Sequence, residues 1–132
     1  MFANSHAFSG FSVDDIDAAR SFYGGTLDLD ATEAHGMLTL HFEGGGELLI
    51  YPKEDHEPAT FTVLYFPVAD IDAAVDILAA SGVELERYPG MPQDKRGIVR
   101  PPDPEDGPSI AWFKDPAGNI LAVLEKDEEE DA

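Results

Sequence analysis

The sequence has no cysteine and few basic residues, and each shortage excludes a class of function. Without cysteine, the chain can form neither a disulfide framework nor a thiolate nucleophile. Eight Lys and Arg residues against 27 Asp and Glu residues leave a net charge of −19. A charge of this sign and size repels phosphate backbones and anionic lipid, so we expect neither nucleic acid nor a membrane as a partner.

Long apolar runs are also missing. No stretch approaches the roughly 18 apolar residues of a membrane span, and residues 1–8 lack the basic flank of a secretory signal. At 132 residues the chain is expected to form a single domain, located in the cytoplasm. The acidity leaves two interpretations open, adaptation to high salt or an ordinary acidic surface. Residues 127–132 are interpreted as an acidic tail.

What the sequence does contain is an internal repeat. The segment FSVDDIDAA at 11–19 returns as FPVADIDAA at 66–74, at a constant offset of 55 residues. A fixed offset of about half the chain indicates a duplicated unit of secondary structure. We expect two modules, at about 5–53 and about 59–126.

Each copy of the repeat predicts a strand followed by a helix. Residues 7–13 alternate in polarity and residues 61–68 are rich in β-branched and aromatic side chains, as is typical of strands. Asp15 and Asp70 stand where helix N-caps belong. A pair of small residues is then expected to end each helix, namely Gly24-Gly25 and Ser81-Gly82.

Three further strands are predicted in each half. They cover 27–32, 37–43 and 47–52 in the first half, and 83–87, 109–114 and 119–125 in the second. Gly44-Gly45-Gly46 and the segment Asp115-Pro116-Ala117-Gly118 are typical of tight turns between the last two strands of each half. Each half therefore reads β-α-β-β-β, which predicts an α+β fold.

The two halves differ in a long connection at 88–108. Six of its 21 residues are proline, and it contains Lys95, Arg96 and Arg100. Loops of this length inside a compact domain are usually functional. The sequence leaves open whether this one is a lid over a binding site or a structural or dimer-contacting flap.

Two segments resemble a known family. The region 13–27 and the turn FKDPAGN at 113–119, together with the repeat, are similar to the vicinal oxygen chelate superfamily, which includes glyoxalase I, extradiol dioxygenases, and bleomycin and fosfomycin resistance proteins. The resemblance implies that the two tandem modules form a curved mixed sheet around a cleft. It also implies a homodimer.

The resemblance further implies where a metal ion would be held. In the enzymes of the family each module supplies two ligands, typically His, Gln or Glu, and the matching positions here are Phe8, Ile50, Val63 and Ala122. Apolar side chains offer no nitrogen or oxygen donor to a divalent cation, so we expect no metal and no other cofactor. We interpret Glu125 as a solvated strand end and not as a displaced ligand.

The histidines are the remaining candidates for acid/base or metal chemistry. His35 and His56 lie beside loop residues and are expected to be surface side chains, while His6 precedes the first strand. His41 is better placed, because Leu38 and Leu40 take one face of its strand and leave His41 on the other.

The positions implied by the resemblance, together with His41, Trp112 and residues in step with those positions along their strands, give a candidate binding surface of mainly apolar and aromatic character; sheet packing or a dimer seam is the alternative for each residue. Its members are Phe8, Ser12, His41, Ile50, Phe61, Val63, Tyr65, Trp112 and Ala122. Such a surface with a few polar groups is how small-molecule pockets are usually built. For Trp112, stacking on a planar ligand and packing in the core both remain open.

Three functions are compatible with these residues. The first is a metal-independent protein that binds a small, partly apolar or aromatic molecule, neutral or cationic because the protein is acidic. The second is a metal-dependent lyase, isomerase or dioxygenase with unusual ligands such as His41 and Glu47. The third is a non-catalytic accessory or dimerisation module. No residue is proposed as catalytic, because the sequence contains no recognised catalytic motif.

Overall fold

The computed structural model describes residues 1–126, so the acidic tail predicted at 127–132 lies outside the described residues. The chain divides into two compact units, Met1–Pro58 and Ala59–Ala132. The boundary falls between the two modules predicted from the repeat.

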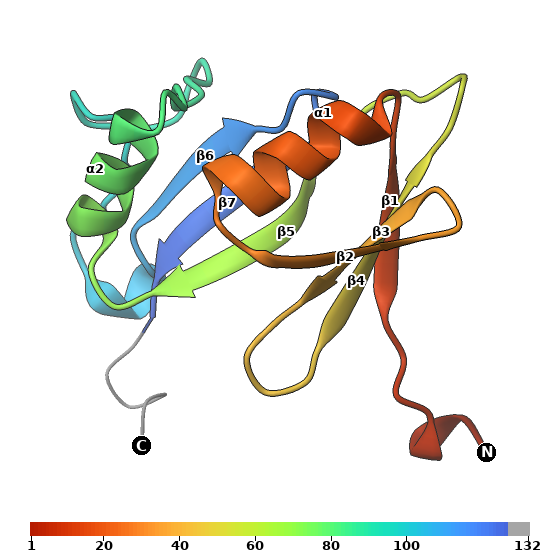
Figure 1. The fold of residues 1–132 in the computed structure, drawn as a ribbon. Coiled ribbons are helices and arrows are strands. Elements are labelled where there is room, and N and C mark those ends of the chain that lie inside the picture. Colours follow the sequence, from red (N-terminus) through yellow and green to blue (C-terminus); the bar gives the residue numbers. More distant parts are fainter. Residues whose placement is uncertain (127–132) are drawn as a thin grey trace. The chain divides into compact units, whose positions relative to one another are not determined.

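The first unit contains a four-stranded mixed sheet. Its elements, in chain order, are η1 (Phe2–Asn4), β1 (Ser9–Val13), α1 (Ile16–Arg20), η2 (Ser21–Thr26), β2 (Asp30–Ala34), β3 (Met37–His41) and β4 (Glu47–Pro52). The strand order is β1-β4-β3-β2 (Figure 1). Only β1 and β4 run parallel, and the other neighbours are antiparallel. This unit therefore realises the predicted β-α-β-β-β order in full.

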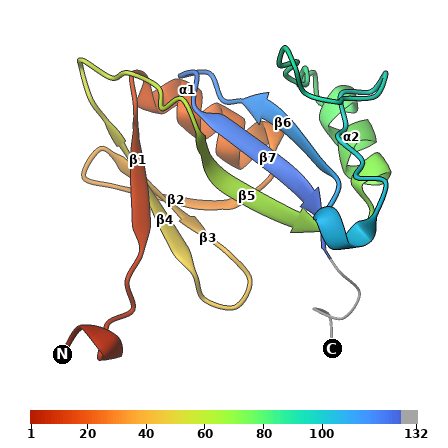
Figure 2. The same cartoon turned by 180° about the vertical axis from the view of Figure 1, so that it is seen from behind.

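The second unit contains a three-stranded mixed sheet. Its elements are β5 (Thr62–Val68), α2 (Ile71–Ala80), η3 (Pro104–Asp106), β6 (Ile110–Lys114) and β7 (Ile120–Glu125). The strand order is β5-β7-β6, with β5 parallel to β7 and β6 antiparallel to it (Figure 2). Two small mixed sheets with few helices confirm the α+β fold class.

One predicted strand is missing from the second unit. Segment 83–87 forms only an isolated bridge between Leu85 and Phe113, next to a hydrogen bond from the Glu86 amide to the Trp112 carbonyl at 2.7 Å. Further along the same edge of β6, Val99 forms a bridge with Ile110 and exchanges two backbone hydrogen bonds with it. The prediction at 83–87 was wrong because the long connection takes part of the edge that this strand would have occupied.

Both helices begin at the predicted aspartates. The Asp15 side chain accepts hydrogen bonds from the amides of Asp17 and Ala18, and Asp70 accepts one from Ala73. The two caps have nearly the same backbone angles, with φ −135° and ψ 107° at Asp15 and φ −137° and ψ 107° at Asp70. A side-chain oxygen that satisfies the first free amides fixes where each helix starts.

The first helix does not stop at its glycine pair. After α1 the chain continues as the wider helical turn η2, in which the Leu27 amide donates to the Phe22 carbonyl at 2.8 Å, five residues back. Gly24 and Gly25 lie inside this turn, so the expected stop there was wrong. The second helix ends as predicted, with Gly82 at φ 83° directly after Ser81.

Each unit has its own apolar core. In the first unit, buried side chains of the sheet share the core with Ala19 and Tyr23 from the helical segment. In the second unit, α2 contributes Ile71, Val75 and Leu78 to the core, and it contacts β7. These contacts determine which face of each sheet is covered by helix and which is left for other contacts.

Candidate functional site

The register of the first sheet shows which side chains share a face. Phe11 is paired with Ile50, and Ile50 with Leu38, and all three are buried, so they lie on the face that packs in the core. Alternation along each strand places the intervening residues on the opposite face. We call this opposite face the first open face; its residues are Gly10, Ser12, Asp30, Thr32, Ala34, Met37, Thr39, His41, Glu47, Leu49 and Tyr51.

Ile50 therefore does not lie on the face where the resemblance implies a metal ligand. It is 0 % exposed and lies in the core of the first unit, on the face opposite Ser12. The residue of β4 that corresponds to Ala122 of β7 is Leu49, because Leu49 pairs with Gly10 while Ala122 pairs with Tyr65, 55 residues after Gly10. Leu49 thus replaces Ile50 in the inferred set, and it is apolar as well.

His41 lies on the first open face, as its strand pattern predicted. Its Nε2 is 2.8 Å from the Thr32 hydroxyl, and its Nδ1 is 3.6 Å from a carboxylate oxygen of Glu47. The ring is thus oriented by one neighbour on β2 and one on β4. His41 and Glu47, the pair named in the metal-dependent hypothesis, do lie side by side, but they provide only two donors.

His56 is not the simple surface side chain that was expected. Its Nδ1 lies 2.6 Å from the hydroxyl of Ser12, and both side chains are half-buried. This contact joins the loop after β4 to the first open face and places an imidazole beside a candidate binding residue. His35, in contrast, is exposed in a turn at φ 55°, as expected.

The second sheet has a corresponding open face. Leu64, Phe113 and Leu121 are neighbours across the strands on the face that packs against the core. On the opposite face Ala122 lies between Tyr65 and Trp112. We call this the second open face; its residues are Thr62, Tyr65, Pro67, Ile110, Trp112, Lys114, Ile120, Ala122 and Leu124.

A β-bulge changes the expected parity at the start of β5. Thr62 pairs with Ile120 and Leu64 pairs with the next residue, Leu121, so Val63 is the extra residue and has no partner. Thr62 therefore shares the face of Tyr65, whereas sequence parity had assigned that face to Phe61 and Val63. Phe61 precedes the strand and is exposed, as is Phe8 before β1.

Tyr88 is a candidate that the sequence analysis missed. Its ring meets that of Trp112 edge-on, with centroids 5.6 Å apart, so Tyr88 extends the aromatic character of the second open face. Its hydroxyl is buried and has no hydrogen-bond partner among residues 1–126. Burial raises the pKa of this phenol, and a phenol is already protonated at neutral pH, so the hydroxyl can donate a hydrogen bond. No local sequence signal marks an unpaired hydroxyl.

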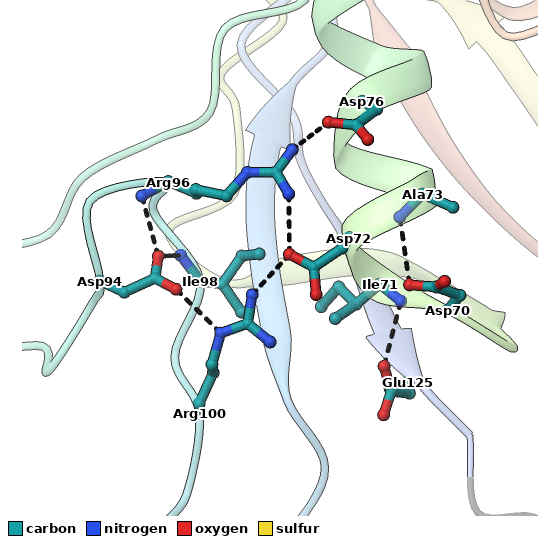
Figure 3. A network of polar contacts seen from close by, with 10 residues as sticks. All are labelled: Asp70, Ile71, Asp72, Ala73, Asp76, Asp94, Arg96, Ile98, Arg100 and Glu125. Carbon is teal, nitrogen blue, oxygen red and sulfur yellow. Dashed lines mark hydrogen bonds and ion pairs between the residues drawn. The ribbon is translucent and has the colours of Figure 1, made fainter.

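The long connection is fixed to α2 by a charged network (Figure 3). Asp72 accepts from both Arg96 and Arg100 at 2.7 Å, and Arg96 also pairs with Asp76. Arg100 donates to Asp94, whose other oxygen accepts from the amides of Arg96 and Ile98. Hydrogen bonds from Arg100 lower the pKa values of Asp72 and Asp94.

Glu125 has a structural partner that was not predicted. Its side chain accepts a hydrogen bond from the Ile71 amide at 3.1 Å and is half-buried (Figure 3). The interpretation as a solvated strand end was therefore wrong, because β7 ends beside the first turn of α2. A carboxylate is favourable there because the helix N-terminus carries free amides and partial positive charge.

The geometry and the comparisons agree on the class of protein. The chain belongs to the Glyoxalase/Bleomycin resistance protein/Dioxygenase superfamily, whose family model matches residues 5–123. This confirms the resemblance to the vicinal oxygen chelate superfamily. No curated protein matches the sequence as a relative.

Solved structures support the same fold. A glyoxalase family protein from Enterococcus faecalis is 21% identical, with a TM-score of 0.67, and the match covers 94% of this chain and 99% of that one. The fosfomycin resistance protein FosX from Listeria monocytogenes is 13% identical, with 96% of both chains covered and a TM-score of 0.70. Lactoylglutathione lyase from Agrobacterium tumefaciens is 20% identical, with 90% and 92% covered and a TM-score of 0.66. These likenesses show the fold and leave the reaction open.

The family's metal does not fit the residues at the corresponding positions. Phe8, Leu49 and Ala122 carry no nitrogen or oxygen donor in their side chains, and Thr62, which the bulge places on this face instead of Val63, offers only a neutral hydroxyl. Across residues 1–126, no three His, Asp or Glu side chains gather closely enough to hold a metal ion. No reaction step through a metal is derived from this donor set. Within the same residues, no helix is long and apolar enough to cross a membrane.

Proposed function

We propose that this protein binds a small, partly apolar or aromatic molecule without a metal ion. The observation that carries the proposal is the chemistry of the four positions at which the family places metal ligands. Phe8, Leu49 and Ala122 are apolar, and the fourth position, Val63 by the repeat offset or Thr62 by the strand register, offers at most a neutral hydroxyl. Side chains of this kind contribute to binding by burial of apolar surface and not by coordination.

The aromatic residues of the second open face support an aromatic or apolar ligand. Tyr65 is 53% exposed, and Trp112 is half-buried beside Tyr88. Aromatic side chains bind flat ligands by stacking and by edge contacts, and they attract cations to their faces. The net charge of −19 also favours a cationic or neutral ligand over an anion.

Each open face carries few polar groups. On the first open face Ser12 contacts His56 and His41 contacts Thr32, and on the second the ring of Tyr88 meets that of Trp112. A surface of this composition takes its affinity from apolar contact and its specificity from a small number of hydrogen bonds. We also retain, as proposals, the homodimer and the cytoplasmic location expected from the sequence.

The proposal is tested by titrating the protein with two compounds that share a naphthalene ring and differ in their head group. We expect 2-naphthylmethylammonium and 2-naphthalenemethanol to change the fluorescence of Trp112, the only tryptophan, and to raise the melting temperature saturably. A chelator should change neither effect. Tyr65→Ser should weaken binding, while Ile77→Ser, which removes an exposed apolar side chain from α2, should not.

Two results would reject the proposal. One is stoichiometric zinc, nickel, manganese or iron in protein purified without an affinity tag, together with loss of ligand binding when the metal is removed. The other is the absence of any saturable fluorescence change with both naphthalene compounds at millimolar concentration. The first result would favour the metal-dependent hypothesis built on His41 and Glu47. The His41 Nδ1 atom lies 3.6 Å from a carboxylate oxygen of Glu47.

Tyr88→Phe should stabilise the free protein and weaken ligand binding. The substitution removes a buried hydroxyl that has no partner within residues 1–126, so the free energy of unfolding should rise by about 1 kcal/mol. If the hydroxyl donates to the ligand, the naphthalenemethanol Kd should increase about fivefold. Urea denaturation and fluorescence titration measure the two effects.

The matched control for this prediction is Tyr65→Phe. It removes the hydroxyl of an exposed tyrosine on the same sheet and should leave the stability within about 0.5 kcal/mol of the wild type. A Tyr88→Phe variant that is less stable than the wild type would show that the Tyr88 hydroxyl is satisfied in solution.

A further inference from the structure

The second unit contains an open groove that the proposed function does not use. Its volume is about 630 Å³, and it lies between α2 and the segment that follows this helix. The apolar part of its lining is formed by Val75, Ala79, Val83 and Leu85. None of these residues belongs to the second open face, so the groove is a separate surface.

The charged part of the lining consists of Glu84, Arg87 and Arg96. Arg96 is neutralised, because it pairs with both Asp72 and Asp76 (Figure 3). Of the three charged residues, Arg87 and Glu84 therefore remain to interact with a charged group of a bound molecule.

Arg87 differs from the other arginines of the described chain. Arg20, Arg96 and Arg100 each pair with two carboxylates, whereas Arg87 pairs with no carboxylate of residues 1–126. Its guanidinium donates to the carbonyl of Asp94 at 2.8 Å and to that of Lys95. In a chain with 27 acidic and eight basic residues, an arginine beside a groove without an acidic partner is unusual.

The two carbonyl contacts hold the guanidinium in place and leave part of it available. Arginine has five N–H donors in a planar fork, and a carboxylate can accept two of them in parallel. Holding the fork before a ligand arrives reduces the entropy lost on binding. The groove thus places an apolar lining next to a guanidinium that is held in position and has no carboxylate partner among residues 1–126. Such a site is complementary to a molecule with an apolar body and one carboxylate.

We propose that this groove binds an apolar monocarboxylate, with its carboxylate on Arg87 and its apolar body along Val75, Ala79, Val83 and Leu85. Glu84 lines the same groove and opposes the bound charge. The proposal thus predicts effects of opposite sign from two neighbouring charges. It does not depend on the proposed function, which concerns the open faces and favours cations and neutral molecules.

The test is an NMR titration of the full chain with octanoate, octan-1-ol and octylammonium, which share one apolar body. Octanoate should shift the signals of Ala79, Val83, Leu85 and the Arg87 side chain, without changing Trp112 fluorescence. The alcohol and the ammonium compound should bind at least about tenfold more weakly, because they lack the charge-assisted hydrogen bonds.

Four variants test the roles of the charged residues and of the apolar lining of the groove. Arg87→Gln should weaken octanoate binding about tenfold, and Glu84→Gln should strengthen it about threefold. Lys95→Gln removes the same charge from the adjoining long connection, at a residue that does not line the groove, and should change the affinity less than threefold. Ala79→Phe fills the groove from an exposed helix position and should abolish binding with Arg87 intact.

Several outcomes would overturn the inference. They are equal affinity for octanoate and octan-1-ol, shifts confined to the open faces, no shift at millimolar octanoate, or an Arg87→Gln variant that binds as well as the wild type. Loss of binding in both Arg87→Gln and Ala79→Phe, with native chemical shifts elsewhere, supports it. The naphthalene experiment reports on Trp112, so either proposal can fail without the other.

Discussion

Replacing Ile98 by alanine should lower the free energy of unfolding by about 2 to 5 kcal/mol. Ile98 lies in the long connection at 88–108 and is 0 % exposed, although sequence patterns give this segment no regular structure. Removing a fully buried isoleucine loses its transfer energy and leaves a cavity that the surroundings fill only in part. Urea denaturation followed by circular dichroism measures the effect.

The control is Met91→Ala in the same connection. Met91 is 44% exposed, so its truncation should cost less than about 1 kcal/mol. Equal, small effects of both substitutions would contradict the prediction and would mean that residues around Ile98 open readily, as expected of a lid. The predicted difference instead favours a structural role for this part of the connection, fixed to α2 through Arg96 and Arg100.

Asp115→Ala should destabilise the protein by about 2 to 4 kcal/mol. Asp115 is buried in the turn between β6 and β7, and it accepts hydrogen bonds from the amides of Ala117 and Asn119 and from the Asn119 side chain. Without the carboxylate these buried donors lose their acceptor, at a cost of about 1–3 kcal/mol for each one left unsatisfied. Chemical denaturation of the two proteins gives the difference.

Asp103→Ala is the matched control for Asp115→Ala. Asp103 is exposed and accepts a single side-chain hydrogen bond, from the Glu105 amide at 3.0 Å, in another turn of the same unit. Its removal should cost about 0.5 kcal/mol or less. A comparable loss in both variants would show that the Asp115 turn contributes no more than an ordinary surface turn.

The sequence predicted those features that depend on neighbouring residues. The caps at Asp15 and Asp70, the glycine hairpin after β3 and the turn at Asp115 each involve partners within a few positions. Such contacts form from local chemistry, so a pattern of residue types is enough to place them. The same holds for the face of His41, which follows from Leu38 and Leu40 on its own strand.

The features that were missed depend on partners far along the chain. Whether Leu49 or Ile50 lies on the first open face depends on how β4 pairs with β1, which is some 40 residues away in sequence. The bulge at Val63, the contact of Ser12 with His56 and the place of Tyr88 beside Trp112 likewise require the folded chain. Alternation along a single strand cannot supply this information. One extra residue in the strand moves each preceding side chain to the other face of the sheet.

The equal geometry of the two aspartate caps has a consequence for how the chain tolerates changes in length. Each cap fixes the rotational starting point of its helix, whatever precedes or follows it. The bulge before Asp70 and the long connection after α2 add residues to the second half, yet Ile71, Val75 and Leu78 still enter the core as a regular stripe. Insertions before a capping aspartate or after the end of its helix should therefore remain local, which makes these segments suitable places for introducing new loops.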